Sequence, residues 1–342
     1  MPLRSIIGGK EINSFDLTKE EWNDLKRNYR IKDLKTVCCG NKAIPKTSNL
    51  GTQFFAHSRR AECTSKPETK EHLLGKEIIA LTARENGWEV KTEYQDGNKW
   101  IADVYCLKDN KKIVFEMQWS PQTNEETERR QSLYRASNIR ACWFIKLQKQ
   151  NKYYYSDLIN SFETPVFGIR YNETDRNFVV PRYNVDLRNM VNGLLNKKLK
   201  WSPQKGYILT AQIILGKDNC WKCGKKIKIA LGIKIKDKYD NELDFKYFND
   251  DRIASLIKRH MNAEIYKKYE VGEIKYRYSN TIKESYLSNG CFFCGAIQGN
   301  FYLHEAEIIE KPIKEFRLEY GKDIEQIEAT WYFIGKKQNR FF

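Results

Sequence analysis

Hydrophobic residues recur at helical spacing in one long polar segment, which predicts a helix over 68–86 that Gly87 ends. The repeating apolar positions are Leu73, Leu74, Ile78 and Leu81. After this helix the pattern predicts strands over 88–94, 100–107, 112–119 and 141–147, with a polar helix over 123–137 before the last strand. The links between the first three strands are rich in turn residues, which favours consecutive antiparallel hairpins. The predicted order is α-β-β-β-α-β.

The flanking regions are less regular. Residues 18–30 indicate a short helix with Thr18 as its N-cap. Residues 38–63 are rich in Gly, Ser, Thr and Pro, which predicts an irregular loop region pinned by metal. Apolar runs predict further strands over 227–235, 301–309 and 329–335.

These patterns divide the chain into four regions. They are an N-terminal cysteine-containing region over 1–66, a core over 67–150, an extension over 151–216 and a second domain over 217–342. The extension has a mixed pattern that predicts no particular element.

Composition narrows the class of protein. No run approaches the ~20 apolar residues of a membrane span, and the N-terminus has neither an apolar core nor a small-residue cleavage site. We therefore expect a cytoplasmic protein that has no membrane partner. An odd count of nine cysteines in a reducing compartment favours metal ligation or burial over disulfides. Cys106 and Cys142 lie in apolar runs and are expected in the core.

Charge indicates an anionic partner. Sixty Lys and Arg against 44 Asp and Glu give a formal net charge of +16. A basic surface attracts phosphate backbones, so nucleic acid, above all DNA, is the expected partner. Lysine enrichment for solubility is the alternative.

Two acidic residues end up side by side if the second and third core strands pair as a hairpin. Asp103 lies on the first of these strands, whereas Glu116 and Gln118 lie on the next and share one face. Facing carboxylates repel unless a cation lies between them, and Mg²⁺ or Mn²⁺ suits oxygen ligands. Solvated acids at strand ends are the alternative.

Two cysteine pairs, each followed by Gly, have the form of zinc knuckles. The predicted ligands of a structural Zn²⁺ are Cys220, Cys223, Cys291 and Cys294. The gap between the pairs exceeds the usual ribbon spacing, so an insertion must bridge them. A redox-active CxxC pair is the alternative.

A second zinc site is a weaker hypothesis, because its spacing is irregular and adjacent cysteines seldom both bind one ion. Its candidate ligands are Cys38, Cys39, His57 and Cys63. Buried thiols are the alternative.

Several short motifs in order make the chain resemble the PD-(D/E)XK nuclease superfamily, and more closely its competence protein CoiA-like branch. The motifs are FAHSRRAEC (55–63), ETKEHLLGK (68–76), WIADV (100–104), FEMQWS (115–120), RRQSLY (129–134) and CWFI (142–145). The resemblance implies an α+β or α/β fold with a PD-(D/E)XK restriction-endonuclease-like core, to which the cysteine pairs add a zinc-ribbon-like C-terminal domain.

The resemblance also implies roles for individual residues. Asp103 and Glu116 would bind the catalytic metal with the Met117 carbonyl, and Glu71 would add a further acidic ligand. His72 and Lys76, which share a helix face, would contact the substrate phosphate, unless that face is merely solvated.

The second core helix and the third strand complete the implied site. Arg130 and Tyr134 match the family's Arg-x-x-x-Tyr, and Arg130 would clamp phosphate or form a structural ion pair with the first core helix. Gln118 stands where the superfamily's commonest form has Lys, so it would orient a water molecule but cannot act as a base.

The leading hypothesis is therefore a Mg²⁺- or Mn²⁺-dependent nuclease that hydrolyses DNA phosphodiester bonds in DNA uptake, recombination or defence. The alternative is a non-catalytic zinc-ribbon protein that binds nucleic acid on a nuclease-like platform. A homo-oligomer, or partner proteins of a DNA-processing or defence system, would fit either hypothesis. A zinc protein associated with tRNA or the ribosome would rest on basicity alone.

Overall fold

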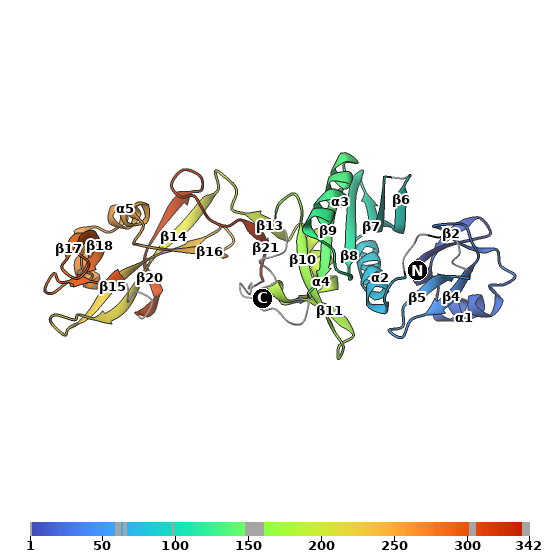
Figure 1. Ribbon diagram of the computed structural model, residues 1–342, viewed down its shortest axis with the longest axis horizontal. Coiled ribbons are helices and arrows are strands. Elements are labelled where there is room, and N and C mark those ends of the chain that lie inside the picture. Colours follow the sequence, from blue (N-terminus) through green and yellow to red (C-terminus); the bar gives the residue numbers. More distant parts are fainter. Residues whose placement is uncertain are drawn as a thin grey trace. The chain divides into compact units, whose positions relative to one another are not determined.

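The computed structural model describes residues 2–58, 63, 67–97, 99–147, 161–300 and 306–336. The chain forms two compact units, Met1–Lys200 with Trp331–Phe342, and Trp201–Thr330. The fold is mixed α/β, with several sheets and few helices among the described residues (Figure 1).

The first unit begins with a small sheet and a hairpin around one helix. The sheet has the order β2-β1-β3, and β4 pairs with β5. The elements are β1 (Arg4–Ile7), β2 (Lys10–Asn13), α1 (Lys19–Asn28), β3 (Leu34–Thr36), β4 (Ala43–Thr47) and β5 (Gln53–His57). Thr18 caps α1 as predicted, because its hydroxyl accepts the Glu21 N–H while Glu21 accepts the Thr18 N–H.

The irregular loop predicted over 38–63 is wrong for much of that range. Residues 43–57 form the β4–β5 hairpin, in which Pro45 pairs with Phe55. Proline is tolerated in an edge strand, so a composition typical of loops did not prevent pairing here. Phe55 is buried against Trp22 of α1 and closes a small local core.

A seven-stranded sheet is the centre of the first unit, in the order β12-β11-β10-β9-β8-β7-β6. Strands β8, β9 and β10 run parallel, and the other neighbours are antiparallel. The elements are α2 (Lys70–Glu85), β6 (Glu89–Asp96), β7 (Trp100–Lys108), β8 (Lys111–Gln118), α3 (Asn124–Ala136), β9 (Arg140–Lys146), β10 (Val166–Asn172), β11 (Asn177–Val180), β12 (Val185–Asp186) and α4 (Leu187–Leu195).

The helices α2 and α3 cover opposite faces of this sheet. On β8, Glu116 bonds to Tyr134 of α3, whereas the next residue, Met117, packs against Gly75 of α2. Successive side chains of a strand point to opposite faces, so the two helices enclose the strand pair β7–β8. Both helices are visible against the sheet in Figure 1.

The side chains of Cys106 and Cys142 are buried, as predicted.

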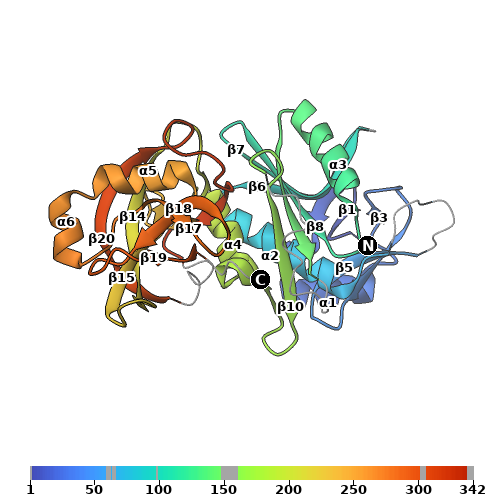
Figure 2. The same cartoon turned by 60° about the vertical axis from the view of Figure 1, so that its left-hand side comes forward.

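The second unit is built on a four-stranded antiparallel sheet in the order β16-β15-β14-β20. A smaller sheet, β17-β18-β19, lies beside it (Figure 2). The cysteine pair of Cys291 and Cys294 lies between β18 and β19. The elements are β14 (Ile208–Asn219), β15 (Lys226–Lys236), β16 (Glu242–Tyr247), α5 (Asp251–His260), α6 (Ala263–Tyr269), β17 (Lys275–Ser279), β18 (Glu284–Gly290), β19 (Ile297–Gln298) and β20 (Glu307–Glu319).

Two strands lie at the boundary between the units. They are β13 (Leu199–Ser202) and β21 (Thr330–Phe333), which pair with each other. The predicted strand over 227–235 lies within β15, and the predicted strand over 329–335 contains β21. Of the strand predicted over 301–309, residues 301–305 lie outside the described residues. Among the described residues, no helix has both the length and the apolar character that a membrane crossing needs.

Candidate active site and metal centres

Asp103 lies where the regular pairing of β7 is interrupted. The register between β7 and β8 ends at Val104 opposite Phe115, and that between β6 and β7 passes from Thr92–Val104 to Tyr94–Ala102. On β6 the intervening residue is Glu93, whose backbone has a φ of +47°. This local break frees backbone and side-chain groups of both strands for other partners.

At this break the Asp103 carboxylate contacts both β8 and α2. Its Oδ2 accepts a hydrogen bond from the Met117 N–H (2.9 Å) and lies 3.2 Å from His72 Nε2. Burial alone would raise the pKa of Asp103, but His72, Lys76 and the Met117 amide outweigh it and hold this pKa well below its usual range. The same pairing raises the pKa of His72 against the opposing effect of burial. Asp103 is therefore ionised at neutral pH.

Lys76 is completely buried one helical turn after His72. Its Nζ lies 2.6 Å from Glu68 and 2.5 Å from Glu93. Burial favours the neutral amine, but these two carboxylates raise the pKa of Lys76 above its ordinary value. A solvated helix face is therefore excluded for Lys76, which is a buried ammonium between two acids.

Glu116 faces α3 and is 2% exposed. Arg130 donates to its Oε2 at 2.7 Å, and the Tyr134 hydroxyl donates to its Oε1. Burial and the nearby charge of Asp103 raise the pKa of Glu116 to about 7, although Arg130 and Tyr134 oppose the shift. Glu116 is thus a carboxyl group that titrates near neutrality.

Arg130 is held in place from two directions. Its guanidinium lies 4.9 Å from the ring centre of Trp143, a buried core residue, and it donates to Glu116. Arg130 therefore forms a structural ion pair, but its partner is Glu116 of strand β8 and not the first core helix. An arginine in this position can also meet an incoming phosphate.

Two of the predicted site residues have other contacts. The Gln118 side chain donates to the Ser120 carbonyl at 2.6 Å. Glu71 lies 3.8 Å from Lys70, on the first turn of α2. Of the residues that the structure describes, only two cysteine groups bring three or more potential metal ligands within 4.8 Å of one another. Glu71, Asp103 and Glu116 do not form such a group.

The first of these groups joins the two CxxC pairs of the second unit. Its members are Cys220, Cys223, Cys291 and Cys294. Cys220 Sγ lies 3.7 Å from Cys294 Sγ, and Cys223 Sγ lies 3.7 Å from Cys291 Sγ. Burial raises the pKa of Cys220, but hydrogen bonds from the amides of Cys223 and Lys222 outweigh it and lower this pKa to about 6. The four thiols can hold one metal ion.

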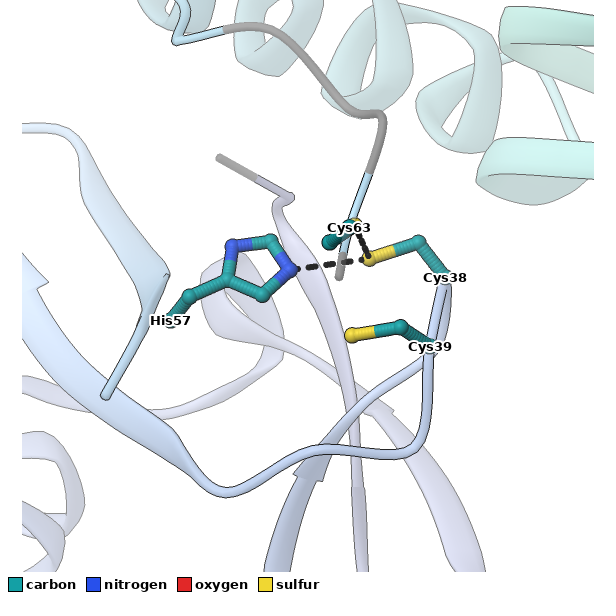
Figure 3. Close-up of side chains that lie close together, drawn as sticks. All are labelled: Cys38, Cys39, His57 and Cys63. Carbon is teal, nitrogen blue, oxygen red and sulfur yellow. Dashed lines mark hydrogen bonds between the residues drawn. The ribbon is translucent and has the colours of Figure 1, made fainter. Parts of the chain in front are cut away.

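The other group lies in the first unit and comprises Cys38, Cys39, His57 and Cys63 (Figure 3). His57 Nε2 lies 3.2 Å from Cys38 Sγ, and Cys63 Sγ lies 3.7 Å from the same sulfur. His57 ends β5, whereas the adjacent cysteines follow β3. All four side chains can hold one metal ion, including both adjacent cysteines.

A shared turn geometry links the N-terminal group to the CxxC pairs. Gly224 donates to the Cys220 carbonyl and Gly295 to the Cys291 carbonyl, and both glycines have a φ of +68°. Gly40, also at +68°, donates in the same way to the Thr36 carbonyl. Thr36 thus occupies the position of a first knuckle cysteine, and its hydroxyl lies 3.1 Å from Cys39 Sγ. In this turn Cys39 keeps the position of the second knuckle cysteine, and Cys38 lies two residues after the first position.

With this geometry established, the chain can be compared with known families. Residues 68–213 match the family model described as competence protein CoiA, nuclease-like domain. This segment of the chain is therefore similar to the CoiA nuclease-like domain. No curated protein and no solved structure gives a match. The resemblance inferred from the short motifs is confirmed for this segment.

The matched segment contains Asp103, Glu116 and the side chains that contact them, as well as the start of the second unit. Sequence reasoning named His72, Lys76 and Arg130 but missed Glu68 and Glu93. The first of these lies in the ETKEHLLGK motif, four residues before His72 and eight before Lys76, a helical spacing that signals a shared face. Nothing in the sequence around Glu93 indicates its positive φ or its contact with Lys76.

Proposed function

We propose that the protein is a metal-dependent nuclease that hydrolyses phosphodiester bonds of DNA. The CoiA nuclease-like domain and the net charge of +16 support this proposal. We further propose that α2 to β9 form a PD-(D/E)XK core, which acts in the cytoplasm in DNA uptake, recombination or defence, with partners from such a system or a second copy of the chain.

One observation carries the proposal: a buried carboxyl, Glu116, lies within the electrostatic influence of a second carboxylate, Asp103. Without a cation between them, this placement opposes ionisation of Glu116. A divalent ion such as Mg²⁺ or Mn²⁺ removes that opposition and accepts oxygen ligands. Asp103 and Glu116 would hold the ion, whereas Glu71 does not fit as the third ligand in the present arrangement.

The bound ion would polarise a phosphoryl oxygen and make a water molecule more acidic. The chain's own residues supply the remaining tasks. Arg130 keeps its positive charge and suits the non-bridging oxygens of a phosphate. His72 can hold or release a proton at Nε2 beside Asp103. Lys76 is fixed too deeply to meet the substrate, and it instead balances the carboxylates of Glu68 and Glu93.

The test uses purified protein with single-stranded, duplex and branched DNA in the presence of Mg²⁺ or Mn²⁺, and again with EDTA. Cleavage should require the metal and should fall at least a hundredfold in Asp103→Asn and Glu116→Gln. Glu128→Gln, the same change at an exposed position of α3, is the matched control and should retain activity. Equal cleavage by all three variants would overturn the assignment.

A non-catalytic nucleic-acid-binding protein is the second candidate. Its support is that both oxygens of Glu116 already accept hydrogen bonds and that Gln118 donates to Ser120. In that case DNA binding would survive EDTA, and no form of DNA or RNA would be cleaved with either metal.

We also propose that both cysteine groups bind Zn²⁺. Zn–S bonds of about 2.3 Å in a tetrahedron place two sulfurs about 3.8 Å apart. The 3.7 Å separations in both groups agree with this value. Each ion would have four protein ligands and no open position, so its role would be structural.

A further inference from the structure

Large aromatic side chains are exposed on the two knuckles of the second unit. Trp221 is 70% exposed, Phe292 38% and Phe293 41%, and all three lie between the cysteines of a CxxC pair. Tight turns hold each knuckle, and the proposed zinc ion would tie the two together, so these side chains project from a rigid base. Exposed rings on a rigid base need a reason, because burying them would stabilise the fold.

The rings belong to one surface because the two knuckles contact each other. The Trp221 Nε1–H donates to the Ile297 carbonyl of the other knuckle at 2.6 Å. In the reverse direction, Lys225 Nζ lies 4.6 Å from the ring centre of Phe293. We call this the knuckle surface, and it comprises Trp221, Lys222, Lys225, Phe292 and Phe293.

The charge of the knuckle surface has one sign. Lys222, Lys225 and Lys226 are exposed. The segments 220–228 and 287–300, which contain both knuckles, include no Asp or Glu. Rings interleaved with lysines are poorly suited to the core of a protein interface, from which lysine is depleted. They suit a polyanion that also carries flat apolar groups.

Single-stranded nucleic acid is that kind of ligand. Its bases expose the faces that a duplex hides, and they stack on aromatic side chains while the phosphates meet basic groups. We propose that the knuckle surface binds single-stranded nucleic acid, with bases stacked on Trp221, Phe292 and Phe293 and phosphates beside Lys222 and Lys225. This site goes beyond the proposed nuclease function, because it lies in the second unit and requires no catalysis.

The test measures binding by the full-length Asp103→Asn protein, so that loss of cleavage has no influence on the result. Fluorescence anisotropy with a labelled oligothymidine and with a duplex of the same length gives both affinities. The single strand should bind more tightly, and Trp221→Ala with Phe293→Ala should weaken this binding at least tenfold. Trp221→Tyr keeps a stacking face and should restore most of the affinity that Trp221→Ala alone removes.

Controls separate stacking from loss of fold. Tyr247→Ala removes another exposed aromatic of the same unit and should change the affinity less than twofold. Zinc content and circular dichroism must match for all variants. Lys222→Gln with Lys225→Gln should reduce the slope of log K against log salt by about 1.4, at about 0.7 per phosphate contact for single strands.

Three outcomes would overturn the proposal. The first is equal affinity for duplex and single strand. The second is an affinity of the Trp221→Ala, Phe293→Ala variant within twofold of that of the Tyr247→Ala control. The third is self-association through the knuckle surface without nucleic-acid binding. None of these outcomes bears on metal-dependent cleavage, which the Asp103→Asn and Glu116→Gln variants test separately.

Discussion

Protons can take the place of a divalent charge in the acidic network of the first unit. The carboxyl groups of this network are those of Glu68, Glu93, Asp103 and Glu116. Lys76 and Arg130 are permanent cations that contact these carboxyl groups. The raised pKa values of His72 and Glu116 allow this site to take up two protons instead. A divalent ion would then exchange with protons on binding.

The first prediction concerns Glu116 in metal-free protein. Its folded-state pKa of about 7 exceeds the ordinary value of 4.5, so the folded protein binds this proton more tightly than the unfolded chain does. The resulting stability is complete below pH 4.5 and is lost as pH rises through about 7. Urea unfolding between pH 5 and 8.5 should show this loss in the wild type and not in Glu116→Gln.

Mg²⁺ provides the control for this prediction. If Asp103 and Glu116 hold the ion, its charge lowers the pKa of Glu116 and the wild type loses less stability over the same pH range. His72 titrates in the wild type and in Glu116→Gln, so its contribution to the pH dependence of stability cancels when the two proteins are compared. Parallel pH profiles for wild type and Glu116→Gln would contradict the prediction.

A second prediction concerns Lys76, whose ammonium is buried between Glu68 and Glu93. Lys76→Met keeps most of the side-chain volume but leaves both carboxylates without this partner. The free energy of unfolding should fall by roughly 3 kcal/mol, the lower part of the range for breaking a buried pair, because both acids keep some exposure. Lys70→Met on the exposed side of α2 is the control and should change it by about 0.5 kcal/mol at most. A loss below about 1 kcal/mol for Lys76→Met would count against the buried network.

The site residues were predictable from the sequence only as far as local spacing reaches. The i, i+4 positions of His72 and Lys76 predicted a common face, and the family motifs marked Asp103, Glu116 and Arg130. The depth of Lys76 depends on Glu93, which comes from another element and an irregular backbone conformation. Such contacts follow from tertiary packing, which no local pattern encodes.

At the scale of elements, Gly75 sets the distance between α2 and β8. A Cβ at this position would lie 2.3 Å from Met117 Cε and 2.8 Å from its Sδ. The helix backbone can therefore lie directly over Met117, whose amide binds Asp103. The glycine costs helix propensity and permits the contact between the two elements that form the site.

The third prediction follows from this contact. Gly75→Ala should gain up to about 1 kcal/mol of helix propensity but lose about 1–3 kcal/mol to overpacking, so the protein should be less stable. In a Met117→Ala background the clash is absent, and the same change should be stabilising. Thermal unfolding of the four proteins in this cycle measures the coupling. Equal effects of Gly75→Ala in both backgrounds would rule out the contact as its cause.

Elements of the core were predictable because they are long, periodic and separated by clear turns. The helix predicted over 68–86 is α2, and the strands predicted over 88–94, 100–107 and 112–119 are β6, β7 and β8. In contrast, residues 43–57 pair as a hairpin despite their loop-like composition, because Phe55 finds its core partner on the distant α1. The knuckle at Thr36 escaped notice for a similar reason, since its first position carries no cysteine.

At the scale of the whole molecule, the two cysteine groups lie in separate compact units. The fourth prediction is therefore two zinc ions per chain that are lost independently. Cys223→Ser should abolish one and expose only the second unit to limited proteolysis, whereas Cys38→Ser should abolish the other and affect only the first. Atomic emission measures the zinc content.

Matched controls are available among the core thiols. Cys142→Ser changes a buried cysteine outside both groups, so it should destabilise the first unit without altering zinc content. Loss of both ions from either single variant would show that the groups are not independent.

The connectivity of the first unit has a consequence for its biosynthesis. Trp331 receives a hydrogen bond from the Tyr183 hydroxyl at its carbonyl (2.9 Å), and the Ile334 N–H donates to the Lys198 carbonyl (2.8 Å). The first unit therefore requires residues that the ribosome adds only after Trp201–Thr330. The second unit, although encoded later than most of the first, has its complete sequence available earlier. A nascent chain can thus complete the sequence of the second unit while the first unit still lacks its final strand, β21.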